Sequence, residues 1–240
     1  MPYDSRYELD LLRGTEEPRP WNLIEIIEKY ARKTDILLDI GCGTAFKLIQ
    51  LADKVAKIYG IEPNKEMRIK AEENIGKERV SNIVLIEGKS ERIPFESNYF
   101  DIVTCMVAPH ITAEVHRILK PNGYAILEKI GDRDKWNFKQ EFGSDDKGYR
   151  GQFSDLPDGE RERIYEKEFG ELFSEVSVQN GFWRTYYTMS GLVLLLEQTP
   201  AIRGYDTKND IEILDKIKRK YSTARGIETT QNRILIIARK

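Results

Sequence analysis

The stretch ILLDIGCGTAFKLIQL, from Ile36 to Leu51, decides the fold of this chain. It begins with a short apolar strand, ILLDI, and passes through the glycine turn GCGT. It then enters a helix whose apolar side chains include Phe46, Leu48 and Leu51. A strand, a glycine loop and an amphipathic helix in this order are typical of an α/β protein with a parallel sheet.

The same alternation continues toward the carboxyl terminus. KIYGIE, IVLIEG, FDIVTCM and GYAILEKI are further apolar runs, and Asn64 is a suitable cap for a helix through Asn74. A second helix is expected from about Ile111 to Leu119, and residues 120–123, KPNG, predict a turn after it. Strands separated by helices predict parallel strands joined by right-handed crossovers.

Segments on either side of this core carry weaker signals. Residues 1–20 are polar and predict an arm leading to a helix that starts near Trp21. Beyond residue 130, short helices are expected over 136–142, 160–168, 192–197 and 211–221, and β segments over 176–187 and 233–238. We predict an N-terminal arm and helix over 1–34 and one domain over 35–240, with a helical insertion at about 189–230 between the last two strands.

Composition excludes several classes of protein. The formal net charge is -2 and the pI about 5.9, so no overall positive field favours nucleic acid or anionic lipid. The chain has no signal-like amino terminus and no window approaching the roughly 20 apolar residues that span a bilayer. We therefore predict a cytoplasmic protein without membrane contact. The two cysteines lack metal-ligand spacing, so no metal site is predicted.

Acidic and glycine residues mark the expected ligand site. In an open parallel sheet a ligand binds beyond the carboxyl ends of the strands, where the loop from Asp39 to Ala45 lies. Gly41 and Gly43 allow close approach of backbone, and the Asp39 carboxylate would repel a pyrophosphate but attract a cation. Glu62 ends the second strand, where a carboxylate can accept hydrogen bonds from both ribose hydroxyls. Because bulky Phe46 replaces the third glycine of the dinucleotide fingerprint, NAD binding is rejected.

These blocks resemble the class I S-adenosylmethionine-dependent methyltransferases. The resemblance rests on DIGCGTA, YGIEPNKEM, EGKSERIPFESNYFDIV and LKPNGYAIL, in the family's order over residues 35–130. It implies a Rossmann-like, seven-stranded, mostly parallel sheet with helices on both faces, the last two β segments forming an antiparallel edge. It also implies S-adenosyl-L-methionine as cofactor.

The resemblance assigns roles residue by residue. Asp39, Gly41 and Gly43 would surround the methionine end, Glu62 the ribose, and residues 89–91 the adenine. Two positions depart from the family pattern, Ala45 in place of a third glycine and Lys89 in place of an aspartate that would accept the adenine amino group. The full predicted cofactor-binding set is Asp39, Gly41, Cys42, Gly43, Glu62, Pro63, Met67, Lys89, Ser90, Glu91 and Cys105.

Methyl transfer requires little from the protein beyond in-line positioning of the acceptor. Residues 104–110 end the fourth strand and should face the transferring methyl group, and His110 is the candidate to take or orient an acceptor proton. The alternative for His110 is a loop histidine bonded to backbone or water. Cys105 is not expected to act as a nucleophile, because the Pro-Cys pair of pyrimidine methylation is replaced by Thr104 and Cys105.

A small molecule is the favoured acceptor. The acidity of the chain and the aromatic residues between Trp136 and Tyr187 suit an apolar pocket better than a phosphate track. An RNA acceptor is the alternative, supported only by a basic run at 216–220. A non-catalytic regulatory subunit that keeps the cofactor pocket is a third possibility. The sequence leaves the oligomeric state open.

Overall fold

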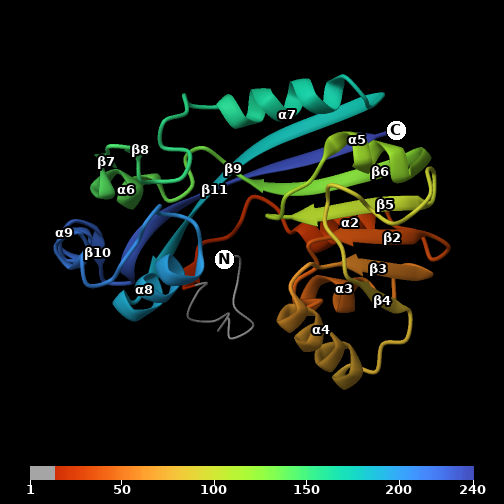
Figure 1. Ribbon diagram of the computed structural model, residues 1–240, viewed down its shortest axis with the longest axis horizontal. Coiled ribbons are helices and arrows are strands. Elements are labelled where there is room, and N and C mark those ends of the chain that lie inside the picture. The colour runs from red at the N-terminus through yellow and green to blue at the C-terminus, as the bar shows by residue number, and fades with distance from the viewer. Residues whose placement is uncertain (1–13) are drawn as a thin grey trace. The chain divides into compact units, whose positions relative to one another are not determined.

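The computed structural model describes residues 14–240, so the part of the predicted N-terminal arm over 1–13 lies outside the described residues (Figure 1). The described chain divides into two compact units. The larger unit comprises Trp21–Lys129, Glu162–Gln179 and Ile234–Lys240. The smaller unit comprises, in its described part, residues 14–20, Ile130–Arg161 and Asn180–Arg233. The sequence-based boundaries at residue 34 and at about 189–230 stay predictions.

Parallel strands form the centre of the larger unit, as predicted. β2 (Ile36–Ile40) pairs with β3 (Lys57–Ile61) on one side and with β5 (Phe100–Met106) on the other. β4 (Ile83–Ile86) pairs with β3, and β6 (Leu119–Ile130) pairs with β5. Figure 1 shows these arrows side by side. Their nearly continuous apolar sequences fit a sheet that is covered on both faces.

Helices cover both faces of these strands. α2 (Leu23–Tyr30), α3 (Phe46–Leu51) and α4 (Lys65–Lys77) share one hydrophobic core with the sheet. α5 (Thr112–Ile118) and α7 (Glu160–Gly170) contribute to the core on the other face. Leu37 and Leu38, neighbours on β2, belong to opposite cores, as the alternation of a strand requires.

Asn64 caps α4 as predicted. Its side-chain oxygen Oδ1 accepts a hydrogen bond from the backbone N–H of Met67 at 3.0 Å. The cap satisfies one of the amide groups that a helix leaves unbonded at its start. It thereby fixes the point at which the chain leaves β3 and turns into α4.

The strand count differs from the predicted seven. The main sheet of the described chain has nine strands in the order β1-β9-β11-β6-β5-β2-β3-β4, with β10 paired to β11. The two additional strands, β1 (Thr15–Glu16) and β10 (Ser222–Thr223), have two residues each. Segments this short carry no periodic pattern, so the sequence could not predict them. β1 also displaces β9 (Glu175–Tyr187) from the edge of the sheet.

The predicted turn over residues 120–123 lies inside β6. Its register with β5 shifts from Phe100 opposite Leu119 to Ile102 opposite Tyr124, so the intervening residues of β6 bulge out of the ladder. Asn122 has a φ of 66° in this bulge. The prediction of a turn between a helix and a separate strand is therefore wrong, because residues 120–123 belong to β6 and form an irregularity within it.

β11 (Gly226–Arg239) is longer than the predicted segment from Arg233. It runs antiparallel to β6, because the N–H of Lys240 donates to the carbonyl of Gly123 and the N–H of Gly131 donates to that of Asn232. The added residues, 226–232, include the polar run ETTQN, which carries no strand-like apolar alternation.

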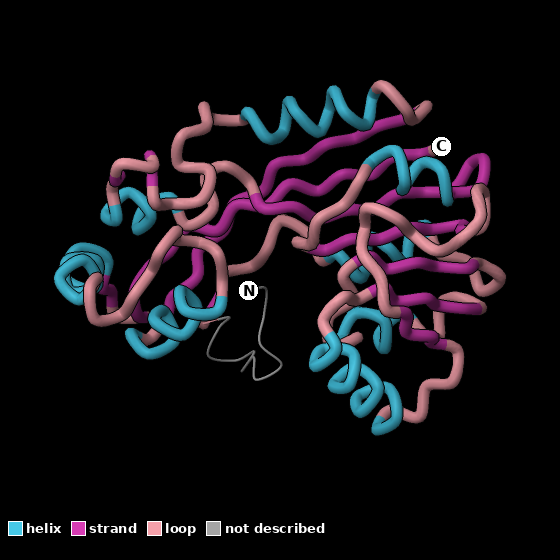
Figure 2. The backbone as a smooth tube through the Cα atoms, in the orientation of Figure 1, coloured by secondary structure: helices cyan, strands magenta, loops and turns pink. Residues whose placement is uncertain are grey.

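The smaller unit contains the remaining elements, drawn by type in Figure 2. α6 (Trp136–Lys139) and the 3-10 helix η1 (Gln140–Phe142) confirm the predicted helix over 136–142. The hydrophobic core of the smaller unit is formed by α6, η1, α8 (Met189–Gln198) and α9 (Ile211–Tyr221). The strand residues Tyr187 and Ile227 adjoin these helices and belong to the same core. β7 (Ser144–Asp145) and β8 (Gly148–Tyr149) form a separate hairpin. No helix within residues 14–240 is long and apolar enough to cross a membrane.

Candidate functional site

The carboxyl ends of β2, β3 and β5 meet at one edge of the larger unit. Asp39 lies opposite Gly60 of β3 and Thr104 of β5, so the loop after β2 emerges between its two neighbours. The chain leaves β2 toward β3 on one side, while β5 occupies the other. This is the switch point at which open parallel sheets bind ligands.

The loop after β2 is held tightly against its surroundings. The N–H groups of Gly41 and Cys42 both donate to the carbonyl of Ile61, at 2.8 and 3.1 Å. Gly41 has a φ of 71°, and a Cβ added to it would lie 2.3 Å from the Cβ of Ala108. Only glycine fits there. Ala45, at the family's third glycine, also adopts a left-handed conformation, with a φ of 61°.

Asp39 forms a buried ion pair that the sequence did not predict. Its Oδ1 accepts from the Lys47 ammonium at 2.7 Å and from the Thr104 hydroxyl at 2.6 Å. The side chains are 0% exposed for Asp39 and 5% exposed for Lys47. The Lys47 ammonium therefore compensates the charge of Asp39 at one of its two carboxylate oxygens. The other oxygen of Asp39, Oδ2, is buried without a hydrogen-bond partner among the described residues.

Glu62 connects the first loop to the second. Its Oε2 accepts from the N–H of Gly43 at 3.0 Å and its Oε1 accepts from the N–H of Asn64 at 2.9 Å. The carboxylate is thereby fixed at the end of β3. Because each carboxylate oxygen can accept two hydrogen bonds, both oxygens keep capacity for hydroxyl donors.

Cys42 directs its thiol into the core. Its side chain belongs to the hydrophobic cluster that includes Leu48, and a Cβ added to Gly60 would lie 2.7 Å from Sγ. Burial raises the pKa of the Cys42 thiol, and the charges of Asp39 and Glu62 raise it further. A thiol held neutral in this way packs the loop and is chemically inert.

The remaining predicted cofactor residues follow β3 and β4. Met67 is buried beside the loop, with its Cε 3.5 Å from a Cβ built on Gly43, whereas Pro63 is exposed. Residues 89–91 follow β4, which pairs with β3 up to Ile61 opposite Ile86. Among them Lys89 and Glu91 are exposed, and Ser90 is buried. The three loops therefore lie at the same end of the sheet.

The end of β5 carries a second buried cation. Lys129 donates to the Sγ of Cys105 at 3.1 Å and to the carbonyl of Ala108 at 2.6 Å. Val107, between them, has a φ of 55°, which β-branched residues rarely adopt. Such strain collects at functional sites, where the surrounding contacts hold it. Neither Lys129 nor this strain was predicted from the sequence.

His110 packs against aromatic rings of α7. Its imidazole stacks on Phe169 with ring centroids 5.7 Å apart and lies 6.0 Å from the ring of Tyr165. α7 thus fixes the ring of the predicted catalytic histidine. On the opposite face, Trp21 donates its indole N–H to the buried Glu128 carboxylate at 2.7 Å, a contact between residues far apart in sequence.

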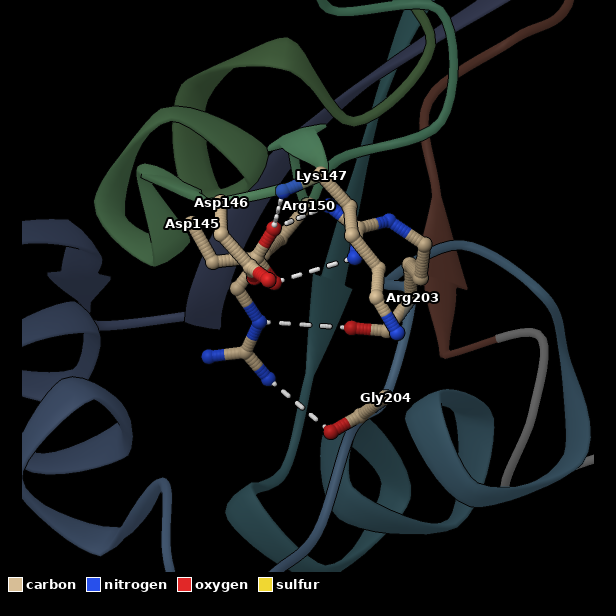
Figure 3. Close-up of a pocket in the computed structure, with 6 residues that line it drawn as sticks. All are labelled: Asp145, Asp146, Lys147, Arg150, Arg203 and Gly204. Atoms are coloured by element: carbon tan, nitrogen blue, oxygen red, sulfur yellow. Dashed lines mark hydrogen bonds and ion pairs between the residues drawn. The ribbon is translucent and has the colours of Figure 1, made fainter.

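A hollow of about 420 Å³ in the smaller unit is a weaker candidate for a ligand-binding site. Figure 3 shows its charged lining, in which the Arg203 guanidinium bonds Asp145 and the backbone N–H of Lys147 bonds the same carboxylate. Arg150 forms a two-pronged ion pair with Asp210 at 2.7 and 2.9 Å. Because these charges already satisfy one another, the hollow offers little to a charged ligand.

Part of this chain is similar in sequence to known proteins. Residues 38–127 match the family model described as a methyltransferase domain. A demethylmenaquinone methyltransferase of Bacillus licheniformis is 30% identical over 164 residues, which cover 60% of this chain and 70% of that protein. An uncharacterised methyltransferase of Schizosaccharomyces pombe is 35% identical over 116 residues, 42% of each chain. A demethylmenaquinone methyltransferase of a Geobacillus species matches over 48% of its own length at 32% identity. The chain thus spans under half of these last two relatives.

Solved structures share the fold. The YcgJ protein of Bacillus subtilis superposes with a TM-score of 0.68, over 91% of this chain and 97% of that one, at 19% identity. A protein of Bacillus halodurans described as a putative methyltransferase gives a TM-score of 0.64, over 91% and 98%, at 18% identity.

Proposed function

Because this chain belongs to the class I S-adenosylmethionine-dependent methyltransferases, we propose that it transfers a methyl group from S-adenosylmethionine to a small-molecule acceptor. Two relatives described above are named demethylmenaquinone methyltransferases, and this supports a small organic acceptor. A cytoplasmic location is part of the same proposal.

S-adenosylmethionine is the cofactor, and the ends of β2 and β3, with Asp39 and Glu62, carry the proposal because they fit that molecule. The unpartnered, buried Oδ2 of Asp39 is an acceptor suited to an ammonium group. The Glu62 carboxylate is oriented by two backbone amides and can accept from a pair of ribose hydroxyls. Gly41 approaches Ala108 closely and has no side chain. Backbone atoms therefore form the inner wall of the proposed cofactor site at this point.

We assign the other residues by position. Gly41, Cys42 and Gly43 contribute loop backbone at the methionine end, and Cys42 also packs the loop from below. Pro63 and Met67 wall the adenine on one side, with residues 89–91 beside its edge. Cys105, held by Lys129, shapes the floor under the methyl group.

The sulfonium of the bound cofactor supplies an already activated methyl group. The protein therefore needs to hold the acceptor in line and manage one proton. We propose that His110, fixed by the rings of Phe169 and Tyr165, orients or removes that proton. Lys47 serves as a positioning residue that fixes the Asp39 carboxylate.

Calorimetric titration of the purified chain with S-adenosylmethionine, S-adenosylhomocysteine and NAD tests this function. We expect both sulfur nucleosides to bind and NAD not to bind. Asp39→Ala and Glu62→Ala should each weaken binding of both nucleosides by about a hundredfold or more, because each removes a charged acceptor. Glu73→Ala, an exposed carboxylate on α4, is the matched control and should bind normally. Preferred binding of NAD, or unchanged binding in both site variants, would overturn the proposal.

A further inference from the structure

The chain segment that follows β5 passes close to the loop that we propose for the cofactor. A Cβ added to Gly41 would lie 2.3 Å from the Cβ of Ala108, so these two residues are in close contact. Further along the same segment, His110 stacks on Phe169 of α7. Residues 107–110 therefore connect the cofactor loop to the histidine that we propose to handle the acceptor proton.

The backbone of this segment is strained. Val107 has a φ of 55°, a left-handed conformation that is costly for a residue with a branched Cβ. Its N–H nevertheless donates to the carbonyl of Glu128 at 2.8 Å, so the residue stays bonded to the end of β6. A conformation of this kind persists only where the surrounding structure over-determines it. Further contacts must therefore hold the segment in place.

Lys129, the next residue of β6, supplies such contacts. Its ammonium donates to the carbonyl of Ala108 at 2.6 Å and to the Sγ of Cys105 at 3.1 Å. The Cys105 thiol also donates to the Ala108 carbonyl, at 3.3 Å. Cys105 precedes Val107 in the chain and Ala108 follows it, so the lysine bridges the strained residue from both sides.

Burial argues against a role in packing alone. Lys129 is 4% exposed. A buried ammonium needs hydrogen-bond partners to offset the loss of water, whereas an apolar side chain of similar length would need none. In return, a charged donor forms a stronger hydrogen bond to a carbonyl than a neutral donor does. A lysine at this position is therefore suited to holding backbone in a conformation that the backbone itself disfavours.

We propose that Lys129 is a positioning residue for methyl transfer. It holds residues 107–110 in the strained conformation that places Ala108 against Gly41 and His110 on α7. The imidazole is thereby fixed beside the cofactor before the acceptor binds, and such pre-organisation is what an in-line transfer requires. The role in methyl transfer rests on the proposed function, whereas the effect of Lys129 on the position of His110 does not.

The imidazole of His110 reports on this position by NMR, because the chain has two histidines and their ring C–H signals are easily separated. His110→Gln assigns the signals. The ring of Phe169 stacks on His110 and should give its signals a ring-current shift. His116 packs edge-on against Phe173, with ring centroids 5.2 Å apart, and is the internal reference.

Lys129→Met is the first variant. We expect the His110 signals to lose their ring-current shift and the His116 signals to stay in place, because the lysine acts on one segment. Lys120→Met, which removes a lysine from the other end of β6, is the matched control and should leave both histidines unchanged. Unchanged His110 signals in Lys129→Met would overturn the proposal.

Val107→Gly separates positioning from a general loss of structure. Glycine adopts a positive φ without strain, so the segment should keep its conformation without the lysine. The double variant Lys129→Met with Val107→Gly should therefore restore the His110 signals. It should also restore folding if Lys129→Met alone does not fold. Absence of recovery in the double variant would mean that Lys129 serves the fold at large, and would also overturn the proposal.

S-adenosylmethionine and S-adenosylhomocysteine, added to the same samples, test the link to methyl transfer. The two molecules differ by the transferable methyl group and the positive charge on sulfur, so they should give different His110 signals in the wild type. Lys129→Met should still bind both, because Gly41 and Gly43 have backbone hydrogen bonds of their own. It should lose the difference between the two complexes.

The same titrations distinguish a failure of this proposal from a failure of the proposed function. Binding of both nucleosides with equal His110 signals in the wild type would overturn the positioning role and leave the proposed function standing. Binding of neither nucleoside would reject the proposed function, and with it the role of Lys129 in methyl transfer, whatever the position of His110.

Discussion

Two groups of buried polar residues in this protein are built on opposite plans. At the carboxyl edge of the larger unit, Asp39 is paired with Lys47 and bonded by Thr104, and Glu62 is held by two backbone amides. In the smaller unit, the buried residues Trp183, Thr185 and Thr229 have polar atoms without partners among the described residues. One group is nearly self-sufficient, and the other is left incomplete by the fold.

The difference separates two uses of polar groups in an interior. A satisfied network orients backbone, and its removal leaves uncompensated charge. An unsatisfied group costs stability in the folded protein, so replacing it by an apolar group of the same shape is expected to be neutral or stabilising. The same substitution should therefore have opposite consequences in the two regions.

The largest expected effect tests the completeness of the first region. Lys47→Met should destabilise the protein by about 3–5 kcal/mol, because it leaves the Asp39 charge buried alone. Adding Asp39→Asn to that variant should recover most of the loss, since the double variant contains no buried charge at the pair. Urea unfolding followed by circular dichroism measures both. Lys70→Met, on the exposed face of α4, is the control. Equal stability of Lys47→Met and the wild type would show that the ion pair of Lys47 and Asp39 contributes nothing to the free energy of unfolding.

The second test concerns the loop that the first region supports. Gly41→Ala places a methyl group against Ala108 and forces alanine into a left-handed conformation, at a cost of about 1–3 kcal/mol. We expect the cofactor affinity to fall at least tenfold by calorimetry. Gly76→Ala, with no atom within 4 Å of the added carbon, is the control and should keep full affinity. A loop that tolerates Gly41→Ala would contradict the close approach described above.

A matched pair of threonine substitutions tests the comparison itself. Thr104→Val removes a hydroxyl bonded to the Asp39 carboxylate at 2.6 Å and should cost about 1.5–3 kcal/mol. Thr229→Val removes an unpartnered hydroxyl and should gain up to about 1 kcal/mol. Both are measured by the same denaturation assay. If the two changes have the same sign, the contrast between the regions is wrong.

A last test compares two buried lysines. Lys47 has a carboxylate partner, whereas the Lys139 ammonium donates to the carbonyl of Gln152 at 2.9 Å. Burial lowers the pKa of Lys139 from 10.5 to about 8. Between these values the unfolded chain holds a proton that the folded protein has released, so stability should rise with pH by about 1.4 kcal/mol per unit.

Urea unfolding at several values between pH 8 and 9.5 measures this slope, with Lys139→Met as the comparison. The variant should show a flatter profile than the wild type over that range. Parallel profiles would mean that Lys139 keeps its proton in the folded protein.

Much of the fold follows from local patterns. The runs ILLDI and FDIVTCM form strands at the predicted residues, and Asn64 caps its helix, because periodicity and capping act between near neighbours. The positions of Asp39 and Glu62 at strand ends followed from the same patterns. The additional strands β1 and β10, each two residues long, were too short to leave such a signal.

The sequence by itself determined the parallel α/β core, the family and the loop that we propose for the cofactor. Only the tertiary structure decided how the buried charges are arranged. Lys47 occupies an ordinary polar position of a short helix, and ETTQNR has the composition of a loop. The contacts around these residues come from strands that are distant in sequence. Thr104 of β5 donates to Asp39, and Gln231 donates to Tyr187 of β9. Hydrogen bonds and ion pairs of this kind act over a few ångströms in space, so no one-dimensional pattern records them.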